Sequence, residues 1–309
     1  MRSQMNIPKT KKRWRRVDGI LLLDKPSGIS SNQALQRARH HFCAEKGGHT
    51  GALDPLATGM LPLCFGEATK IAGWLLGANK AYEAVAKFGV VTDSADADGQ
   101  IVGRYPLPLI SDADLQRAFV PLIGKIQQVP PIFSALKREG EPLYAKARRG
   151  EVVEIDARPV EVHCIKLLEH GDDWAKLYIE CGSGTYIRSL VRDLGEALGC
   201  GAHVQALRRL WVEPFRNVAM QSLEALLTDE VSIGDCAAWR TIEEALAHHP
   251  VVHLDDDEQR RVRQGQSLRD REPATGALPS LALDTQGRAV ALMESDPKGG
   301  IRPNRVFAS

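Results

Sequence analysis

The chain alternates two kinds of hydrophobic periodicity in an irregular order, and this order limits the fold class. Residues Ala81–Phe88 largely alternate apolar and charged side chains, which indicates a half-buried strand. A hairpin-like pair, Val160–Leu168 and Ala175–Cys181, precedes a helical spacing of apolar residues from Ile187 to Leu198. Hairpins are thus mixed with helices, and no regular βαβ rhythm is present. We therefore predict a fold of the α+β class.

The first third of the chain predicts strands and helices around one glycine-rich loop. In order, we expect a strand at Gly19–Leu23, a helix capped by Ser30, Ser31 or Asn32, a loop from Gly47 to Gly59, a strand near Met60–Phe65 and a helix near Glu67–Leu76. Farther along, Ser111 is expected to cap a helix, and Pro142–Arg149 to form a short basic helix that ends at Gly150.

The 309 residues are enough for one large domain and a smaller one. Residues 1–17 contain basic but no acidic residues and are predicted to form a flexible basic arm, either a solvated tail or a phosphate-binding segment. Short strands such as Leu281–Leu283 and Ala289–Met293 dominate beyond Pro250. We therefore assign residues 18–250 to the main domain and 251–309 to a small β-rich domain.

The charge balance and the length of the apolar runs limit the classes of protein to which the chain can belong. Forty Lys and Arg against 39 Asp and Glu give a net charge of +1, so any affinity for nucleic acid depends on where the charges lie. The apolar run Ile20–Leu23 is too short for a signal sequence or a membrane span, and a cytoplasmic protein is expected. The six cysteines include no C-x-x-C pair, so neither zinc nor disulfides are expected.

The loop from Gly47 to Gly59 contains the first candidate for chemistry. Its glycines let the backbone approach a ligand closely, and Pro55 favours an extended backbone at Asp54. An exposed Asp54 with an ordinary pKa near ~4 would be ionised at neutral pH and could act as a nucleophile or electrostatic stabiliser. Asp, Pro, Thr and Gly are also common turn residues, so composition alone favours a turn.

The full string Gly48-His49-Thr50-Gly51-Ala52-Leu53-Asp54-Pro55-Leu56-Ala57-Thr58-Gly59 resembles the catalytic motif of the TruB family of tRNA pseudouridine synthases. The resemblance continues, over roughly residues 18–220, in Leu22-Leu23-Asp24-Lys25-Pro26, Gly66-Glu67-Ala68-Thr69-Lys70, Asp96-Ala97-Asp98-Gly99, Ser134-Ala135-Leu136-Lys137, Gly184-Thr185-Tyr186-Ile187-Arg188 and Leu207-Arg208-Arg209-Leu210. The motif changes the weight given to Asp54 from a turn residue to a catalytic one.

The resemblance implies a fold, a substrate and a reaction. The fold would be the pseudouridine synthase fold, a mixed, largely antiparallel sheet with flanking helices, and residues 251–309 would be an RNA-binding domain of the PUA type. The reaction would convert uridine 55 in the T-loop of tRNA to pseudouridine with Asp54 as the nucleophile. No cofactor, metal or protein partner is implied, and the enzyme would be a monomer. A non-catalytic tRNA-binding chaperone and a guide-dependent pseudouridine synthase subunit are the alternatives.

Three further residues would surround Asp54. Tyr82 matches the family's active-site tyrosine, which can stack on uracil and take part in proton transfer, although core packing would also explain it. Arg188 would pair with Asp54, orient it and keep it ionised, and Tyr186 would form a wall of the uracil pocket. Without the motif, a surface ion pair and a packing residue would be the simpler interpretations.

The remaining predicted contacts are with the target nucleotide, which must unstack from its neighbours before it can react. By resemblance, His49 inserts among the displaced bases, Leu207 belongs to the uracil pocket and Lys25 contacts the substrate. Leu207 could equally be a core residue. Two groups of basic residues are candidates for phosphate binding or for solvated surface, namely Lys137, Arg138, Lys146, Arg148 and Arg149, and the pair Arg208 and Arg209.

Overall fold

The computed structural model describes residues 13–134, 136–138, 140–142, 149, 153, 155–228, 232–234, 236–273 and 278–308. Most of the predicted helix at Pro142–Arg149 and the first twelve residues of the predicted arm lie outside these ranges. The end of the arm is attached to the body: Arg15 forms a parallel bridge with Ala44, and Val17 is buried.

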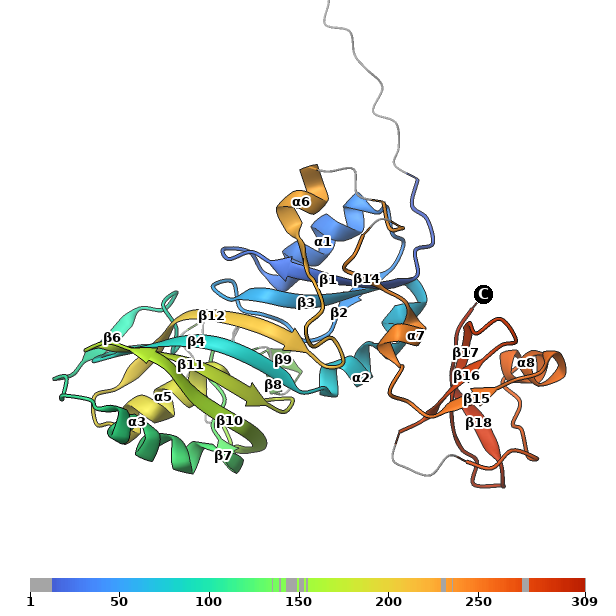
Figure 1. Ribbon diagram of the computed structural model, residues 1–309. Coiled ribbons are helices and arrows are strands. Elements are labelled where there is room, and N and C mark those ends of the chain that lie inside the picture. The colour runs from blue at the N-terminus through green and yellow to red at the C-terminus, as the bar shows by residue number, and fades with distance from the viewer. Residues whose placement is uncertain are drawn as a thin grey trace, which may run out of the picture.

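A ten-stranded sheet runs through the body of the molecule (Figure 1). Along its main path the order is β13-β1-β3-β12-β4-β11-β10-β7, with β14 beside β1 and β2 beside β3. Its strands are β1 (Gly19–Lys25), β2 (Gly47–His49), β3 (Thr58–Phe65), β4 (Lys80–Phe88), β7 (Gly124–Gln128), β10 (Arg158–His170), β11 (Trp174–Cys181), β12 (Ala202–Val212), β13 (Gln221–Ser222) and β14 (Trp239–Arg240). Only the β1–β13 and β3–β12 pairs are parallel, so the sheet is mixed and largely antiparallel.

The helices follow the predicted caps. Ser30 Oγ accepts from the backbone N–H of Gln33, and the Ser30 N–H donates to Oε1 of Gln33, so the first helix begins with a capping box. Ser111 caps α3 in the same way. The α-helices are α1 (Ser31–His41), α2 (Ala72–Gly77), α3 (Asp112–Phe119), α5 (Ile187–Ala197), α6 (Leu223–Thr228), α7 (Ile242–Ala245) and α8 (Asp256–Arg263), and the 3-10 helices are η1 (Gly66–Ile71) and η2 (Val120–Leu122).

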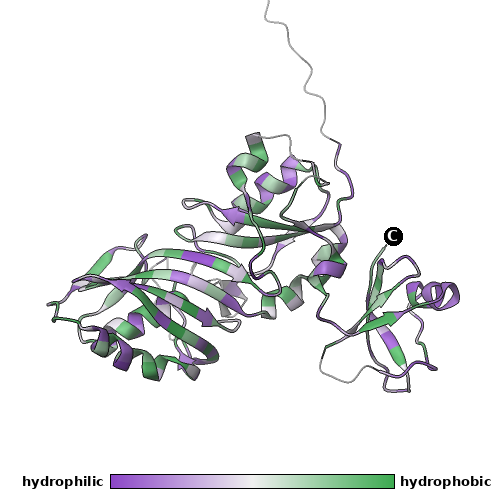
Figure 2. Cartoon of the chain, in the orientation of Figure 1, coloured by the Kyte–Doolittle hydropathy of each residue, from purple (hydrophilic) through white to green (hydrophobic). Residues whose placement is uncertain are grey.

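A second, four-stranded sheet occupies the C-terminal part, in the order β15-β16-β17-β18. Its strands are β15 (Val251–His253), β16 (Ser280–Leu283), β17 (Ala289–Ser295) and β18 (Ile301–Val306). It has a small core of its own, and Figure 2 shows that its helix α8 is largely hydrophilic. Contacts with the body include hydrogen bonds from Lys70 to the Val306 carbonyl and from the Ala308 N–H to Glu67. Two further hairpins, β5 (Val90–Thr92) with β6 (Ile101–Arg104) and β8 (Lys137–Arg138) with β9 (Glu141–Pro142), complete the strands.

The α+β prediction is confirmed, and most predicted elements lie within one or two residues of the observed ones. The glycine-rich loop is the main difference, because Gly47–His49 is a strand that pairs with Leu63–Phe65. The helix expected near Glu67–Leu76 is divided into η1 and α2. Among the described residues, none of the helices has both the length and the hydropathy that a bilayer crossing requires.

The neighbours of β3 explain where the functional loop leaves the sheet. On one edge, β3 pairs with β1 along its whole length. On the other edge, Leu63–Phe65 pair with β2, whereas Thr58 and Gly59 pair with Arg208 and Arg209 of β12. The loop of residues 50–57 therefore emerges at the point where β3 changes partner. Gly59 is required there, because a Cβ at this position would lie 2.1 Å from the Arg209 carbonyl oxygen.

Candidate active site

Hydrogen bonds to the backbone of both neighbours of Asp54 fix the loop that carries it. Ser31, at the start of α1, accepts from the Leu53 N–H at 2.7 Å and donates to the Leu53 carbonyl at 2.9 Å. The Gly28 N–H donates to the Pro55 carbonyl at 2.9 Å. Because both neighbours of Asp54 are held, its carboxylate has a defined direction.

Lys25 supports the same loop. Its side chain is wholly buried, and its ammonium donates to the carbonyls of Pro26 (2.8 Å), Ile29 (2.8 Å) and Pro55 (3.3 Å). These contacts occupy all three N–H groups of a lysine. Burial lowers the pKa of Lys25 to about 8, against an opposing effect of Asp54. The geometry therefore favours a structural role for Lys25 over the contact with substrate that the resemblance implies.

Arg188 lies between the carboxylates of Asp54 and Asp96, and the sequence predicted its pairing with Asp54. Its Nε is 3.0 Å from Oδ2 of Asp54, and its Nη2 is 3.3 Å from Oδ1. Its Nη1 is 3.5 Å from Oδ2 of Asp96, and two backbone carbonyls, of Ser94 (2.9 Å) and Phe133 (2.8 Å), complete its contacts. The arginine is buried, so these contacts fix the plane of the guanidinium and with it the orientation of Asp54.

The pKa of Asp54 differs from the ordinary value expected from the sequence. Burial raises this pKa, Arg188 opposes the rise, and the negative charges of Asp96 and Asp98 add to it. Part of the side chain, 40%, remains accessible, and Asp54 lines two adjoining pockets. Desolvation and the arginine partner therefore act on the pKa of Asp54 in opposite directions.

A pocket of about 240 Å³ opens above Asp54. Tyr82 on β4, Tyr186 before α5 and Leu207 on β12 all line it together with Asp54 and Arg188, so five of the predicted site residues meet here. Burial raises the pKa of both tyrosines, which keeps their hydroxyls protonated near neutral pH. The volume and the two aromatic rings suit a small flat ring.

His49 lies apart from this pocket lining. It is the last residue of β2 and pairs with Leu63. Burial lowers the pKa of its ring, and its buried Nδ1 has no hydrogen-bond partner among the described residues. A neutral, half-buried imidazole at the base of the loop is compatible with contact with RNA, but no contact in the protein establishes it.

Another wall of the pocket, formed by β4 and β12, contains two cations. Arg209 was a candidate for phosphate binding or for solvated surface, but it is 1% exposed, and its guanidinium donates to the carbonyls of Met60 (2.7 Å) and Gly51 (3.1 Å). Both interpretations are wrong, because the guanidinium is buried and already bound to groups of the protein. Arg208 beside it forms a two-pronged pair with Asp24 at 2.8 and 2.9 Å.

Lys80 is the second cation of this wall, and sequence reasoning missed it. The side chain lines the pocket beside Arg209. In the sequence, only its place on the alternating strand, two residues before Tyr82, indicated that it could reach the pocket. The other basic group lies largely outside the described side chains, and its one described member, Arg149, is paired with Glu141 at 2.5 Å.

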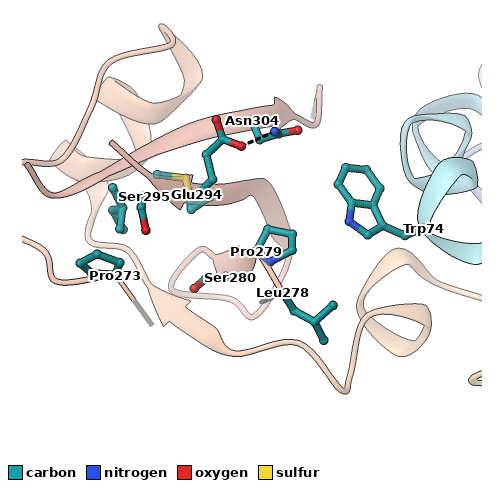
Figure 3. Close-up of a pocket in the computed structure, with 10 residues that line it drawn as sticks. Trp74, Pro273, Leu278, Pro279, Ser280, Glu294, Ser295 and Asn304 are labelled. Atoms are coloured by element: carbon teal, nitrogen blue, oxygen red, sulfur yellow. Dashed lines mark hydrogen bonds between the residues drawn. The ribbon is translucent and has the colours of Figure 1, made fainter. Parts of the chain in front are cut away.

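A second hollow, of about 330 Å³, lies between Trp74 on α2 and the C-terminal sheet (Figure 3). Its carboxylate, Glu294, accepts from Asn304 at 2.5 Å and from Arg302 at 3.0 Å, so its oxygens are already bound. Among the described residues, no group of three His, Cys, Asp or Glu side chains could hold a metal ion. The pocket at Asp54 is therefore the better candidate for chemistry.

Comparisons with known proteins find relatives over nearly the whole chain. A family model described as the TruB family pseudouridylate synthase N-terminal domain matches residues 39–187, and one described as the tRNA pseudouridylate synthase B C-terminal domain matches residues 188–245. Curated relatives called tRNA pseudouridine synthase B include those of Xanthomonas campestris (56% identical, 95% of both chains), Xylella fastidiosa (53%, 95% of this chain and 97% of the relative) and Stutzerimonas stutzeri (45%, 96% and 98%).

Solved structures show the same fold at lower identity. An H/ACA ribonucleoprotein bound to a substrate RNA containing 2′-deoxyuridine matches with a TM-score of 0.71 at 23% identity, covering 94% of this chain and 85% of that one. A Cbf5-Nop10-Gar1 complex matches with a TM-score of 0.70 at 24% identity and the same coverage. At this level of identity the likeness establishes the fold alone.

Proposed function

Because the chain belongs to the TruB family and is a tRNA pseudouridine synthase, we propose that it isomerises uridine 55 of the T-loop with Asp54 as its nucleophile. The observation that carries the proposal is the two-pronged contact of Arg188 with Asp54 at the floor of a pocket lined by two tyrosines. A carboxylate held in one direction and kept ionised beside a cation suits attack on a carbon atom of the substrate.

The chemistry needs little else from the protein. The N1–C1′ bond of uridine breaks and its electron pair leaves with the base, the base turns, and C5 forms a bond to C1′. C5 then loses its proton and N1 gains one, so neither a redox cofactor nor an external reactant is required. Attack on C1′, attack on the uracil ring and an assisted elimination all use the same carboxylate, and Asp54 serves each of them.

The other residues have roles that follow from their positions. Tyr82 and Tyr186 present rings to the pocket and can hold the detached base by stacking, while Leu207 closes the pocket with an apolar surface. A uridine in a folded tRNA loop must be flipped out to reach Asp54. His49, outside the pocket on β2, is assigned to the RNA that surrounds the flipped nucleotide.

The test of the nucleophile is Asp54→Asn, which preserves shape and removes the charge. We expect no detectable pseudouridine in a T-stem-loop after many wild-type half-lives, with the Kd for the stem-loop within about threefold of the wild type, because the carboxylate serves the reaction more than binding. Mass mapping of pseudouridine and a binding titration check this. Formation of pseudouridine by the variant would show that the nucleophile is another group.

The domain assignment and the partners are part of the proposal. Residues 18–250 form the catalytic domain and 251–309 a PUA-like domain that binds the acceptor end of tRNA; the monomer acts in the cytoplasm without a protein partner. Activity of the purified chain on bare T-stem-loop would exclude a guide-dependent enzyme. If the small domain binds the acceptor end, whole tRNA will bind more tightly than the isolated stem-loop, and equal affinities would contradict this role.

A further inference from the structure

Lys80 is a buried cation in the base pocket to which the reaction as described so far gives no role. It is the first residue of β4, it is 6% exposed, and it lines the pocket with Tyr82, Leu207 and Asp54. Residues two apart on a strand face the same side, so Lys80 lies beside the ring of Tyr82. A Cβ on Gly51 of the catalytic loop would lie 3.9 Å from its Cε. The ammonium is thus at the edge of the space assigned to uracil.

The hydrogen bonds of Lys80 leave one donor free. The ammonium donates to the carbonyls of Leu76 at 3.0 Å and Ala78 at 2.5 Å, and no third acceptor or carboxylate lies within bonding distance in the described ranges. Lys25, the other buried lysine at this site, has three acceptors for its three N–H groups. The two carbonyls fix the position of the Lys80 nitrogen, and its remaining N–H is available to a ligand.

The reaction places negative charge where such a donor is useful. When the N1–C1′ bond breaks, its electron pair stays on the base and is delocalised over the ring nitrogens and the two carbonyl oxygens. Attack on the ring also drives electrons onto a carbonyl oxygen. A fixed N–H donor aimed at that oxygen stabilises the charge as it develops, and one such donor contributes about 100-fold to 1000-fold in rate.

We propose that Lys80 is a catalytic residue whose free N–H donates to a carbonyl oxygen of uracil and stabilises the base while it is detached from the ribose. This inference rests on the proposal that the pocket beside Asp54 receives the uridine. A half-turn of the base about the line from C6 to N3 exchanges N1 with C5 and also exchanges the two carbonyls. A single donor therefore contacts a carbonyl oxygen both before and after the turn.

The charge state of Lys80 gives the proposal a measurable signature. Burial lowers its pKa to about 8, Arg209 lowers it further, and Cys181 and Glu213 oppose the shift. The ammonium form stabilises charge best, so the rate should fall as the pH rises through about 8. Lys25 has a similarly lowered pKa, so only substitution of Lys80 assigns the effect.

The experiment compares Lys80→Met and Lys80→Arg with the wild type in single-turnover release of tritium from a T-stem-loop labelled at C5 of the target uridine. We expect Lys80→Met to lose about 100-fold in rate and to lack the fall above pH 8, with the Kd for the stem-loop within threefold. Lys80→Arg, charged at every accessible pH, should recover about tenfold and show no fall near pH 8. The matched control is Lys87→Met on the same strand, where the lysine pairs with the exposed Asp173, and its rate should not change.

The outcomes separate this inference from the proposed function. A Lys80→Met enzyme within threefold of the wild-type rate would overturn the role of Lys80. So would a Lys80→Arg enzyme that still loses rate near pH 8, because another group would then titrate. If Lys80→Met does not fold, Lys80→Arg alone decides by its pH profile. An active Asp54→Asn enzyme would instead overturn the assignment of the pocket, whatever the result at Lys80.

Discussion

The two walls of the base pocket hold their charges in opposite ways. On the wall that carries Asp54, one guanidinium lies between two carboxylates, with Arg188 3.0 Å from Asp54 and 3.5 Å from Asp96. On the wall formed by β4 and β12, Lys80 and Arg209 donate to backbone carbonyls, Arg209 also bonds Tyr82, and no carboxylate among the described residues pairs with either cation. The net charge of the first wall is close to zero or negative, and the net charge of the second wall is positive.

This difference matches the direction in which electrons move during the reaction. In the proposed reaction, the carboxylate acts on the ribose or the ring, while the base takes the electron pair of the broken bond. A positive wall on the side of the base stabilises the separated charges, and the burial of Lys80 and Arg209 strengthens the effect. The difference also indicates which substitutions change the rate and which change the stability of the fold.

Apart from the loss of Asp54 itself, removal of the guanidinium from the first wall should have the largest effect on rate. Arg188→Met leaves two carboxylates without their partner, which should destabilise the fold by about 3 kcal/mol. It also removes the group that orients Asp54, so we expect the rate to fall by roughly 100-fold or more. Because Arg188 lowers the pKa of Asp54, its loss raises that pKa further. The active form is ionised, so activity is lost as pH falls through the higher pKa, and the acid limb of the single-turnover pH profile moves toward neutrality.

The control for this substitution is Arg192→Met, one turn later on α5. Arg192 pairs with Asp193 and is partly exposed, so its loss should leave the pH profile unchanged. An acid limb that stays in place in the Arg188 variant would show that Arg188 does not control the ionisation of Asp54.

The second wall is tested through stability, with two neighbouring arginines as a matched pair. Arg209→Met removes the donors of two buried carbonyls, at Met60 and Gly51, and each unsatisfied carbonyl costs about 1–3 kcal/mol. Arg208→Met breaks a pair with Asp24 that is 38% exposed at the arginine, which is worth about 1 kcal/mol or less. Denaturant unfolding should therefore show a loss about threefold larger for Arg209. Equal losses would mean that Arg209 is not a structural element of this wall.

The sequence predicted one wall better than the other, and the reason is physical. Asp54, Tyr82 and Arg188 lie in motifs that resemble those of the TruB family, so the resemblance predicted that they meet, although the residue types alone did not. Arg209 sits in a run of basic residues that is equally compatible with a phosphate-binding surface. Its burial depends on β3 changing partner from β2 to β12, a long-range pairing that local periodicity does not report.

The same limit applies to the loop and to Lys25. The pattern of glycines suggested one continuous loop, but Gly47–His49 joins the sheet because Leu63–Phe65 have a free edge there. Lys25 was assigned to the substrate because it belongs to a motif, whereas its acceptors are the nearby carbonyls of Pro26 and Ile29 and the carbonyl of Pro55, which reaches it only in the folded chain. Residue types suggest chemistry, and the tertiary structure determines whether a cation is free to use it.

Asp96 supplies the smallest and most specific test of the first wall. Asp96→Asn removes a charge that lies 3.5 Å from Arg188 and keeps the hydrogen-bonding shape, so we expect about a tenfold loss of rate, since Arg188 loses one of its anchors. Asp96 also raises the pKa of Asp54, so its neutralisation should lower that pKa and extend activity to lower pH. The expected result is a slower enzyme with an acid limb at lower pH, measured in the same single-turnover profiles. A slower enzyme whose acid limb moves upward would mean that Arg188 had withdrawn from Asp54, and that Asp96 acts by holding the guanidinium and not by its charge on the nucleophile.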